Sequence, residues 1–438
     1  SINFWRLVCP MVSLPVSTLI TPTSDRGSHL NEQHTSLWQN LQFRIYLGTT
    51  AFTGTATAMQ QLLLSWLLVG ILLLPADQVG MIQALIGLPG IVLMLWGGAS
   101  ADRTDARSFL LKVYAVAWLF PLALFGMTEI GLLNIWTVSL FGIVMSTAIS
   151  FSSPAQQAIL NRVVGTDVQR GVTAATAVGF IVQMLGLILA GQMEIVGVGN
   201  ILLIQSVSLV LGALTVMKIA PLPIARRNNK SSTFDSMLDG FRASYKNKNI
   251  FHTLIITFTS GVFNAGAFMT ALPFIVKRVY DGDALGLATI MIVFYAGATI
   301  SNIIQFRVMP LEKPGLWFLI MQFTRIFIIY LVWIQPEWWV LMAVLFVWGL
   351  NMGVTTNLSR AIMQEASEPE YLARVLSVYT LGMMGSMPVG ALVIGFIIEG
   401  FGTMNAMLPA MFISAVVCIY GFAFTDLSKY TSPSFKAD

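Results

Sequence analysis

The sequence predicts an all-α protein that crosses a membrane many times. Hydrophobic residues make up 56% of the 438 and charged residues only 10%, whereas charged residues make up roughly 25% of a soluble domain. Apolar runs of about 20 residues recur along the chain, the length at which an α-helix crosses roughly 30 Å of hydrocarbon. A membrane β-barrel would show alternating segments of about ten residues instead. We therefore expect most of the surface to face lipid.

The apolar runs predict twelve transmembrane helices in two sets of six. The first set covers residues 43–70, 77–100, 108–128, 132–156, 172–195 and 198–219. The second set covers residues 250–276, 285–308, 315–334, 338–361, 373–398 and 403–424. The predicted division of the chain is an N-terminal tail (1–42), a first bundle (43–219), a linker (220–249), a second bundle (250–424) and a C-terminal tail (425–438).

The first 40 residues differ from the rest in composition. Pro10, Pro15 and Pro22 interrupt a short apolar piece, and a polar run follows as far as Asn40. A secretory signal is the alternative interpretation, and the proline within the short apolar piece argues against it. We expect a poorly ordered tail here.

The positions of Lys and Arg predict how the helices are oriented. They fall almost entirely in one alternating set of connections and chain ends, while the other set holds only Lys277 and Arg278, beside Asp281 and Asp283. Cytoplasmic loops carry the excess of basic residues in membrane proteins. The basic set is therefore expected to be cytoplasmic, with both termini inside and the protein in the inner, cytoplasmic membrane. The sequence pI of 9.1 then reflects topology, and no nucleic-acid partner is expected.

The linker at 220–249 separates the two sets of helices. It begins with the basic, proline-containing stretch "PLPIARRNNKSS". Apolar residues then recur at helical spacing, which predicts an amphipathic helix on the inner leaflet. These residues are Phe234, Met237, Leu238, Phe241 and Tyr245.

An internal repeat relates the two sets. The segment 170–191 parallels 374–395, so that Arg170 aligns with Arg374, Gly186 with Gly390 and Gly191 with Gly395. A parallel repeat of six helices predicts two pseudo-symmetric bundles that rock about a site at mid-membrane.

Four charges stand close together between the second and third spans, in "GGASADRTDARSFLL" at 97–111. Six spans, a basic linker, six more spans and this motif resemble the major facilitator superfamily. The residues in register with its pattern are Gly98, Asp102, Arg103 and Arg107. The "ADRTD" form and the run "SSPAQQAIL" at 152–160 resemble the branch of bacterial secretion transporters that includes the enterobactin exporter. Asp105 and Ala106 depart from the superfamily pattern, which has glycine and arginine there.

The resemblance implies roles for these residues and for the small residues of spans 5 and 11. Gly98, Asp102, Arg103 and Arg107 would form a conformational latch, through ion pairs that break and re-form as the bundles rock. Small residues allow close helix packing or hinge motion, and a proline can kink a helix. The expected hinge or packing residues are Gly186, Gly191, Gly382, Pro388 and Gly390.

In this superfamily spans 1, 4, 7 and 10 line a central cavity. The polar and aromatic residues on these spans and their neighbours are amides, hydroxyls and rings, which suit a bulky amphipathic solute. The expected cavity residues are Gln60, Gln61, Trp66, Gln156, Gln183, Asn264, Trp348, Asn351, Asn357, Tyr379 and Arg325. Arg325 is the exception in charge, and either attracts an anionic solute or serves the structure of a more peripheral span.

The expected function is export of siderophore or drug-like molecules, coupled to protons. Proton coupling follows from the resemblance alone, because no carboxylate lies in the middle of a span. A lipid, lysolipid or nutrient transporter and a non-transporting sensor remain alternatives. Without a P-loop or a His/Cys cluster, we expect no enzyme, metal or cofactor. The partners expected are a small-molecule substrate, protons and membrane lipid, and the protein is expected to be a monomer.

Overall fold

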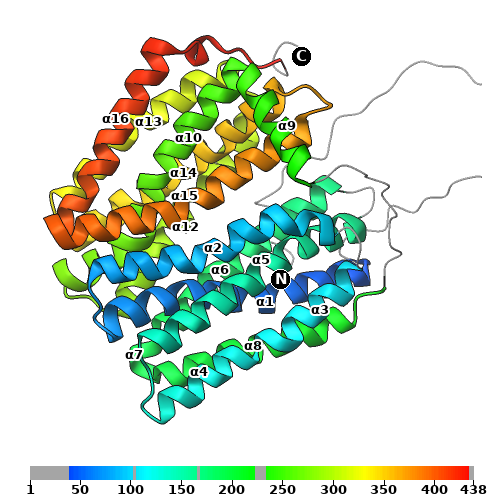
Figure 1. Cartoon of the computed structure of the whole chain (residues 1–438), viewed down its shortest axis with the longest axis vertical. Coiled ribbons are helices and arrows are strands. Elements are labelled where there is room, and N and C mark those ends of the chain that lie inside the picture. The colour runs from blue at the N-terminus through cyan, green and yellow to red at the C-terminus, as the bar shows by residue number, and fades with distance from the viewer. Residues whose placement is uncertain (1–38, 102–104, 165–167, 222–232, 434–438) are drawn as a thin grey trace, which may run out of the picture. The chain divides into compact units, whose positions relative to one another are not determined.

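A computed structural model describes residues 39–101, 105–164, 168–221 and 233–433. Within these ranges nearly every residue is helical and no strand is present (Figure 1). Side chains are not described at 93–101, 168–170, 233–237 and 373. The predicted all-α class is confirmed.

The first bundle contains the helices that precede the linker. They are α1 (Leu41–Trp66), α2 (Ala76–Ala101), α3 (Ala106–Ala117), α4 (Leu119–Glu129), α5 (Ile135–Val164), α6 (Val168–Gly191), α7 (Met193–Val196) and α8 (Val198–Met217). Most boundaries lie within a few residues of the prediction. The fourth span is the main exception, because α5 continues to Val164 instead of ending at residue 156.

The second bundle follows the linker helix α9 (Thr233–Lys246). Its helices are α10 (Lys248–Gly266), α11 (Leu272–Phe274), α12 (Ala284–Val308), α13 (Pro314–Trp333), α14 (Trp338–Ala366), α15 (Leu372–Phe401) and α16 (Met407–Phe424). In the described residues, eleven helices are long and apolar enough to cross a membrane. The predicted second span corresponds to α2, whose apolar part is described over Ala76–Val92.

The predicted third span is formed by two helices, α3 and α4, which meet at Trp118. Pro121 explains the break, because it has no N–H to donate to the carbonyl of Ala117 four residues earlier. The Trp118 indole donates to the carbonyl of Ala115 (2.9 Å) and occupies an acceptor next to the break.

The ends of spans 1 and 7 show the internal repeat in three dimensions. Both end in a π-helical turn, Leu67–Ile71 in one bundle and Ile275–Val279 in the other. Leu74 N donates to Leu68 O (3.0 Å), and Gly282 N donates to Val276 O (2.8 Å). The repeat therefore extends to single backbone hydrogen bonds.

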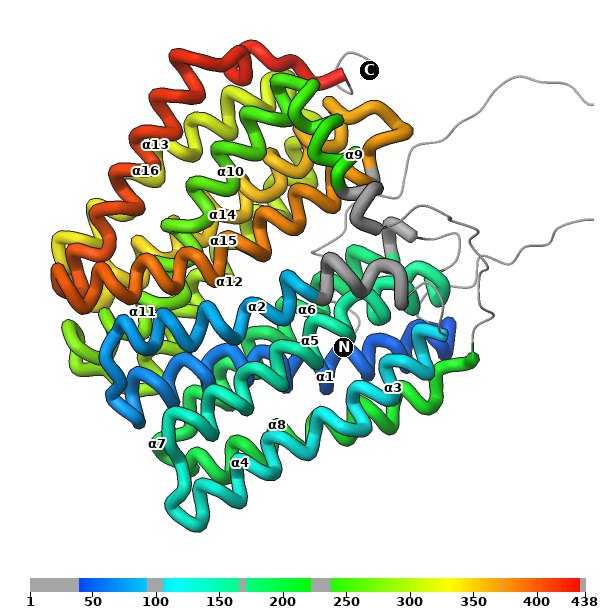
Figure 2. The backbone as a smooth tube through the Cα atoms, viewed as in Figure 1, coloured from blue at the N-terminus to red at the C-terminus, as the bar shows by residue number. Residues whose placement is uncertain are grey.

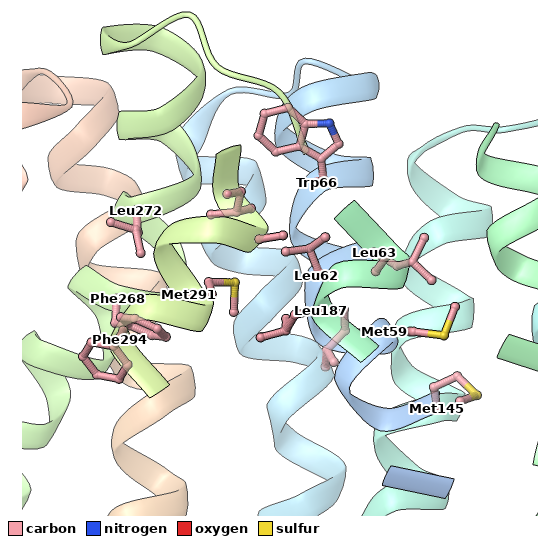
Figure 3. Packing of buried hydrophobic residues seen from close by; sticks show 14 of the residues in the cluster. Met59, Leu62, Leu63, Trp66, Met145, Leu187, Phe268, Leu272, Met291 and Phe294 are labelled. Carbon is pink, nitrogen blue, oxygen red and sulfur yellow. The ribbon is translucent and has the colours of Figure 1, made fainter. Parts of the chain in front are cut away.

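We call the end of the bundles that carries these π-helical turns the far end, and the opposite end the basic end. Between the bundles, α2 lies along α15 (Figure 2), and α6 packs against α12. Buried apolar side chains of both bundles form one continuous cluster. Figure 3 shows part of it, from Met59 and Leu63 in the first bundle to Met291 and Phe294 in the second.

Candidate functional site

Polar side chains join the two bundles at mid-membrane. The Gln61 amide of α1 donates to the Tyr295 hydroxyl of α12 (3.0 Å) and lies 3.6 Å from the sulfur of Met269. The side-chain amide of Gln183 on α6 donates to the side-chain oxygen Oε1 of Gln61 (3.0 Å). A second hydrogen bond joins the bundles, in which the Thr270 hydroxyl donates to the side-chain oxygen Oε1 of Gln83 on α2 (2.6 Å). We call these side chains the polar bridge.

Gln61 and Met269 are equivalent positions of the internal repeat, since they lie 208 residues apart, as do the two π-helical turns. Two equivalent residues can touch only close to the pseudo-twofold axis that relates them. The polar bridge therefore lies on the axis about which the two bundles are arranged.

At the far end, further contacts hold the bundles together. The Lys277 ammonium of the second bundle lies 5.5 Å from the centre of the Trp66 ring, whose indole N–H donates to Glu194 within the first bundle (2.6 Å). Glu399 of α15 accepts a hydrogen bond from the backbone N–H of Ala76 (3.1 Å), at the start of α2.

Glycines allow α2 and α15 to touch in the far half. A Cβ added at Gly395 would lie 2.5 Å from the carbonyl oxygen of Ala76, and one added at Gly80 would lie 2.5 Å from that of Ala391. A side chain at either position would push the helices apart. We call this contact the glycine seam.

The predicted hinge residues divide into three groups. Pro388 contacts Gly87 of α2, and Gly191 lies where a Cβ would be 2.8 Å from Ala288 of α12, so both serve contacts between bundles. Gly186 packs on α1 and Gly390 packs on α10, each within its own bundle. A Cβ added at Gly382 would make only an ordinary contact, 3.6 Å from the Phe258 ring.

Arg325 lies inside the second bundle, 5% exposed. Its guanidinium donates to Asn351 Oδ1 (2.9 Å), Ser260 Oγ (2.6 Å), Gln322 Oε1 (3.1 Å) and Thr355 Oγ1 (2.9 Å). These groups belong to α10, α13 and α14, so the arginine links three helices.

The other predicted cavity residues belong to several local networks. Gln60 accepts from Gln205 inside the first bundle (2.9 Å), and Gln156 donates to the Tyr114 hydroxyl (2.5 Å). Asn264 donates to Ser260 (3.3 Å).

The three remaining cavity candidates lie in the second bundle. The Trp348 ring packs against the rings of Phe268 and Phe294. Asn357 donates to Asn302 (2.7 Å), and the Tyr379 hydroxyl pairs with Ser359 (2.8 Å).

The predicted latch falls mostly outside the described residues. Asp102 and Arg103 lie in the gap, and only the backbone is described at Gly98. Arg107 donates to the carbonyl of Met217 (2.7 Å) and so caps the C-terminus of α8. Asp105 caps the start of α3 through the N–H groups of Arg107 and Ser108.

Sequence reasoning missed several partners in these networks, namely Tyr114, Gln205, Ser260 and Tyr295. Each is a polar residue within an apolar span, which marks it as a group that needs a partner. The sequence carries no sign of which distant helix supplies that partner. Among the described residues, no three His, Cys, Asp or Glu side chains cluster as a metal site.

Comparison with known proteins found a matching family model and solved structures of similar fold. A family model described as transmembrane secretion effector matches residues 35–434. A variant of the nucleoside transporter NupG has a TM-score of 0.70 at 15% identity, over 87% of this chain and 99% of that one. No curated protein matches the sequence.

Two further solved structures share the fold. A bacterial homologue of the human lysosomal transporter Spinster, in an inward-facing and unoccupied conformation, has a TM-score of 0.69 at 11% identity, over 89% of this chain and 98% of that one. A POT family transporter in complex with 5-aminolevulinic acid has a TM-score of 0.67 at 12% identity, over 88% of this chain and 96% of that one. The predicted fold of two pseudo-symmetric six-helix bundles is confirmed, with the number of spans approximate.

Proposed function

The chain belongs to the transmembrane secretion effector family of the major facilitator superfamily, and we propose that it exports small amphipathic organic molecules by alternating access. The family and the fold make it a membrane transporter. The direction of transport, the coupling ion and the class of solute belong to the proposal.

The observation that carries the proposal is the joint between the bundles. It consists of the polar bridge, the glycine seam and the Lys277–Trp66 contact, all in the middle and far parts of the molecule. Each is a contact between surfaces, so the joint can open without unfolding either bundle. Alternating access requires this kind of reversible contact on one side of a central site.

The groups near the joint suit an amphipathic solute. Gln61, Gln183, Asn264 and Tyr295 supply amides and a hydroxyl, and Trp348 with its neighbouring rings supplies apolar surface. We propose these residues as the lining of the pathway. Siderophores and drug-like molecules combine polar groups with apolar surface in this way. Gln60 is turned toward α8 and is left out of the lining.

Proton coupling enters the proposal through the resemblance to secretion transporters. All acidic residues lie at span ends or in connections, so no carboxylate at mid-membrane can carry the proton. The acids that remain as candidates are Asp102, Glu194 and Glu365. Of these, Glu194 is exposed and already accepts from Trp66.

Transport of a nutrient or of a lipid is the second candidate. A nucleoside transporter has the same fold, at an identity that shows the fold alone, and the amide and aromatic groups near the joint also suit a neutral nutrient or a lipid. A sensor that does not transport would keep the same fold.

The deciding experiment measures accumulation of dyes and siderophores in a host that lacks its own exporters, with and without a protonophore. Export is expected to lower accumulation, and the protonophore is expected to abolish the difference. Export that survives the protonophore would remove proton coupling. Accumulation that rises on expression would favour uptake.

A further inference from the structure

Arg325 carries a buried charge that nothing in the described part of the chain neutralises. It lies in the middle of α13, and its exposed fraction is 5%. The ion pairs Arg242–Asp239, Arg374–Asp239 and Lys429–Asp426 do not involve Arg325, and its four hydrogen-bond acceptors among the described residues are all neutral. A charged group at mid-membrane costs at least about 2.5 kcal/mol and is found where the charge is used.

The neighbours of Arg325 are oriented to hold a cation. Asn351 donates its own N–H groups to Thr324 (3.0 Å) and to the carbonyl of Met321 (2.8 Å), so its oxygen faces the guanidinium. Thr355 donates to the carbonyl of Asn351 (2.7 Å), and Ser260 donates to Gln322 (3.1 Å). Only lone pairs therefore meet Arg325. These dipoles stabilise the positive charge, but they leave it uncompensated by any anion.

The charge lies one side chain away from the proposed pathway. Asn264 of α10 is half-buried and donates to Ser260 Oγ, which accepts from Arg325. The Asn264 side-chain oxygen Oδ1 has no partner among the described residues, and neither does the buried side-chain nitrogen Nε2 of Gln322. Asn264, proposed above as part of the pathway lining, therefore connects Arg325 to that lining through Ser260.

No acidic residue offsets the positive charge of Arg325 at mid-membrane, because all Asp and Glu residues lie at span ends or in connections. At an effective dielectric constant near 20, a fixed unit charge about 10 Å from a bound ionic solute changes the protein's affinity for that solute on the order of tenfold. The sign of the net charge near the pathway is positive.

From this charge, and resting on the proposed function, we infer that the transporter selects neutral and anionic amphiphiles and rejects organic cations, with Arg325 setting the preference. A carboxylate or other anionic group of the solute supplies the missing counter-charge during transit. Lipophilic cations, a common kind of drug-like solute, meet repulsion instead.

The test uses three radiolabelled naphthalenes that share one ring system and carry a carboxylate, an alcohol or an ammonium group. Binding to the purified full-length protein is measured at low salt. We expect the carboxylate to bind roughly tenfold more tightly than the ammonium compound. Arg325→Gln should remove this difference and Arg325→Lys should keep most of it. Gln205→Met, which disrupts a buried but neutral hydrogen bond, should leave the preference unchanged.

Tighter or equal binding of the ammonium compound would overturn the inference, as would an unchanged preference in Arg325→Gln or no binding of any compound. Transport of the same compounds into energised proteoliposomes separates this inference from the proposed function. A carboxylate preference without transport would overturn the function and leave the charge selectivity standing. Transport without a charge preference would overturn the charge selectivity and leave the proposed function standing.

Discussion

Single hydrogen bonds connect the two bundles, and Tyr295 makes one that can be removed cleanly. In Tyr295→Phe, the Gln61 amide loses its hydroxyl acceptor, a change of about 0.5–1.5 kcal/mol against the closed joint. Spin labels at Leu132 and Gln335, on far-end connections of different bundles, should then report a larger population at long distance. Tyr330→Phe, on the exposed face of α13, is the matched control. An unchanged distance distribution in Tyr295→Phe would show that the polar bridge does not hold the joint closed.

Asp105 explains one departure from the superfamily motif. Its carboxylate accepts from the N–H groups of Arg107 and Ser108 and so begins α3. Asp105→Ala should lower the stability of the purified protein by about 1 kcal/mol, measured by thermal unfolding, because helix N-caps contribute that much. Asp105→Asn keeps the cap and should behave like the natural protein. Equal loss in both variants would indicate that the charge itself is needed.

Asp102 stands in the same motif, outside the described residues, and its role comes from the resemblance. We expect Asp102→Asn to leave the amount of protein in the membrane unchanged and to reduce transport nearly to background. Membrane content by immunoblot and solute efflux from the same cells measure the two effects. Normal efflux in this variant would reduce the motif to a topology signal.

For whole helices, the glycine seam makes a prediction about closure of the far end. In Gly395→Leu the new side chain would collide with the carbonyl of Ala76, so α2 and α15 could not approach and the far end should stay open. Transport should fall at least about tenfold while both bundles remain folded. Gly400→Leu lies on the same helix where a Cβ would meet nothing within 4 Å and should be tolerated. Normal transport by Gly395→Leu would exclude the seam as part of the cycle.

For the molecule as a whole, the charge asymmetry predicts the orientation in the membrane. Cys9 and Cys418 are replaced by serine, and a single cysteine is placed at Leu132 on the far end or at Lys313 on the basic end. A thiol reagent that does not cross the membrane should label position 132 in intact cells and label position 313 only after lysis. The opposite pattern would contradict the cytoplasmic placement of the basic end and of both termini.

The helices were predictable because the tendency to enter a membrane is nearly additive over the residues of one segment. Leu, Val, Ile and Phe each contribute wherever they stand in a run. The apolar runs therefore locate the spans, and the repeated glycines reveal that there are two related bundles. Pro121 also marks the break between α3 and α4 locally, although the sequence analysis treated 108–128 as one helix.

Hydrogen-bond partners were not predictable, because they depend on how helices distant in sequence are rotated against each other. Gln61 could be identified as polar within span 1, but its partners Tyr295 and Gln183 come from two other helices. Arg325 could be identified as a charge that needs support, while Ser260 and Thr355 were supplied by helix packing. Composition and local pattern, which need no knowledge of distant contacts, are sufficient to identify a membrane protein of two related bundles, and the motif at 97–111 adds the resemblance to a superfamily of transporters. The joint between the bundles and the uncompensated charge beside it emerge only when the helices pack, since both depend on distances between residues far apart in the chain.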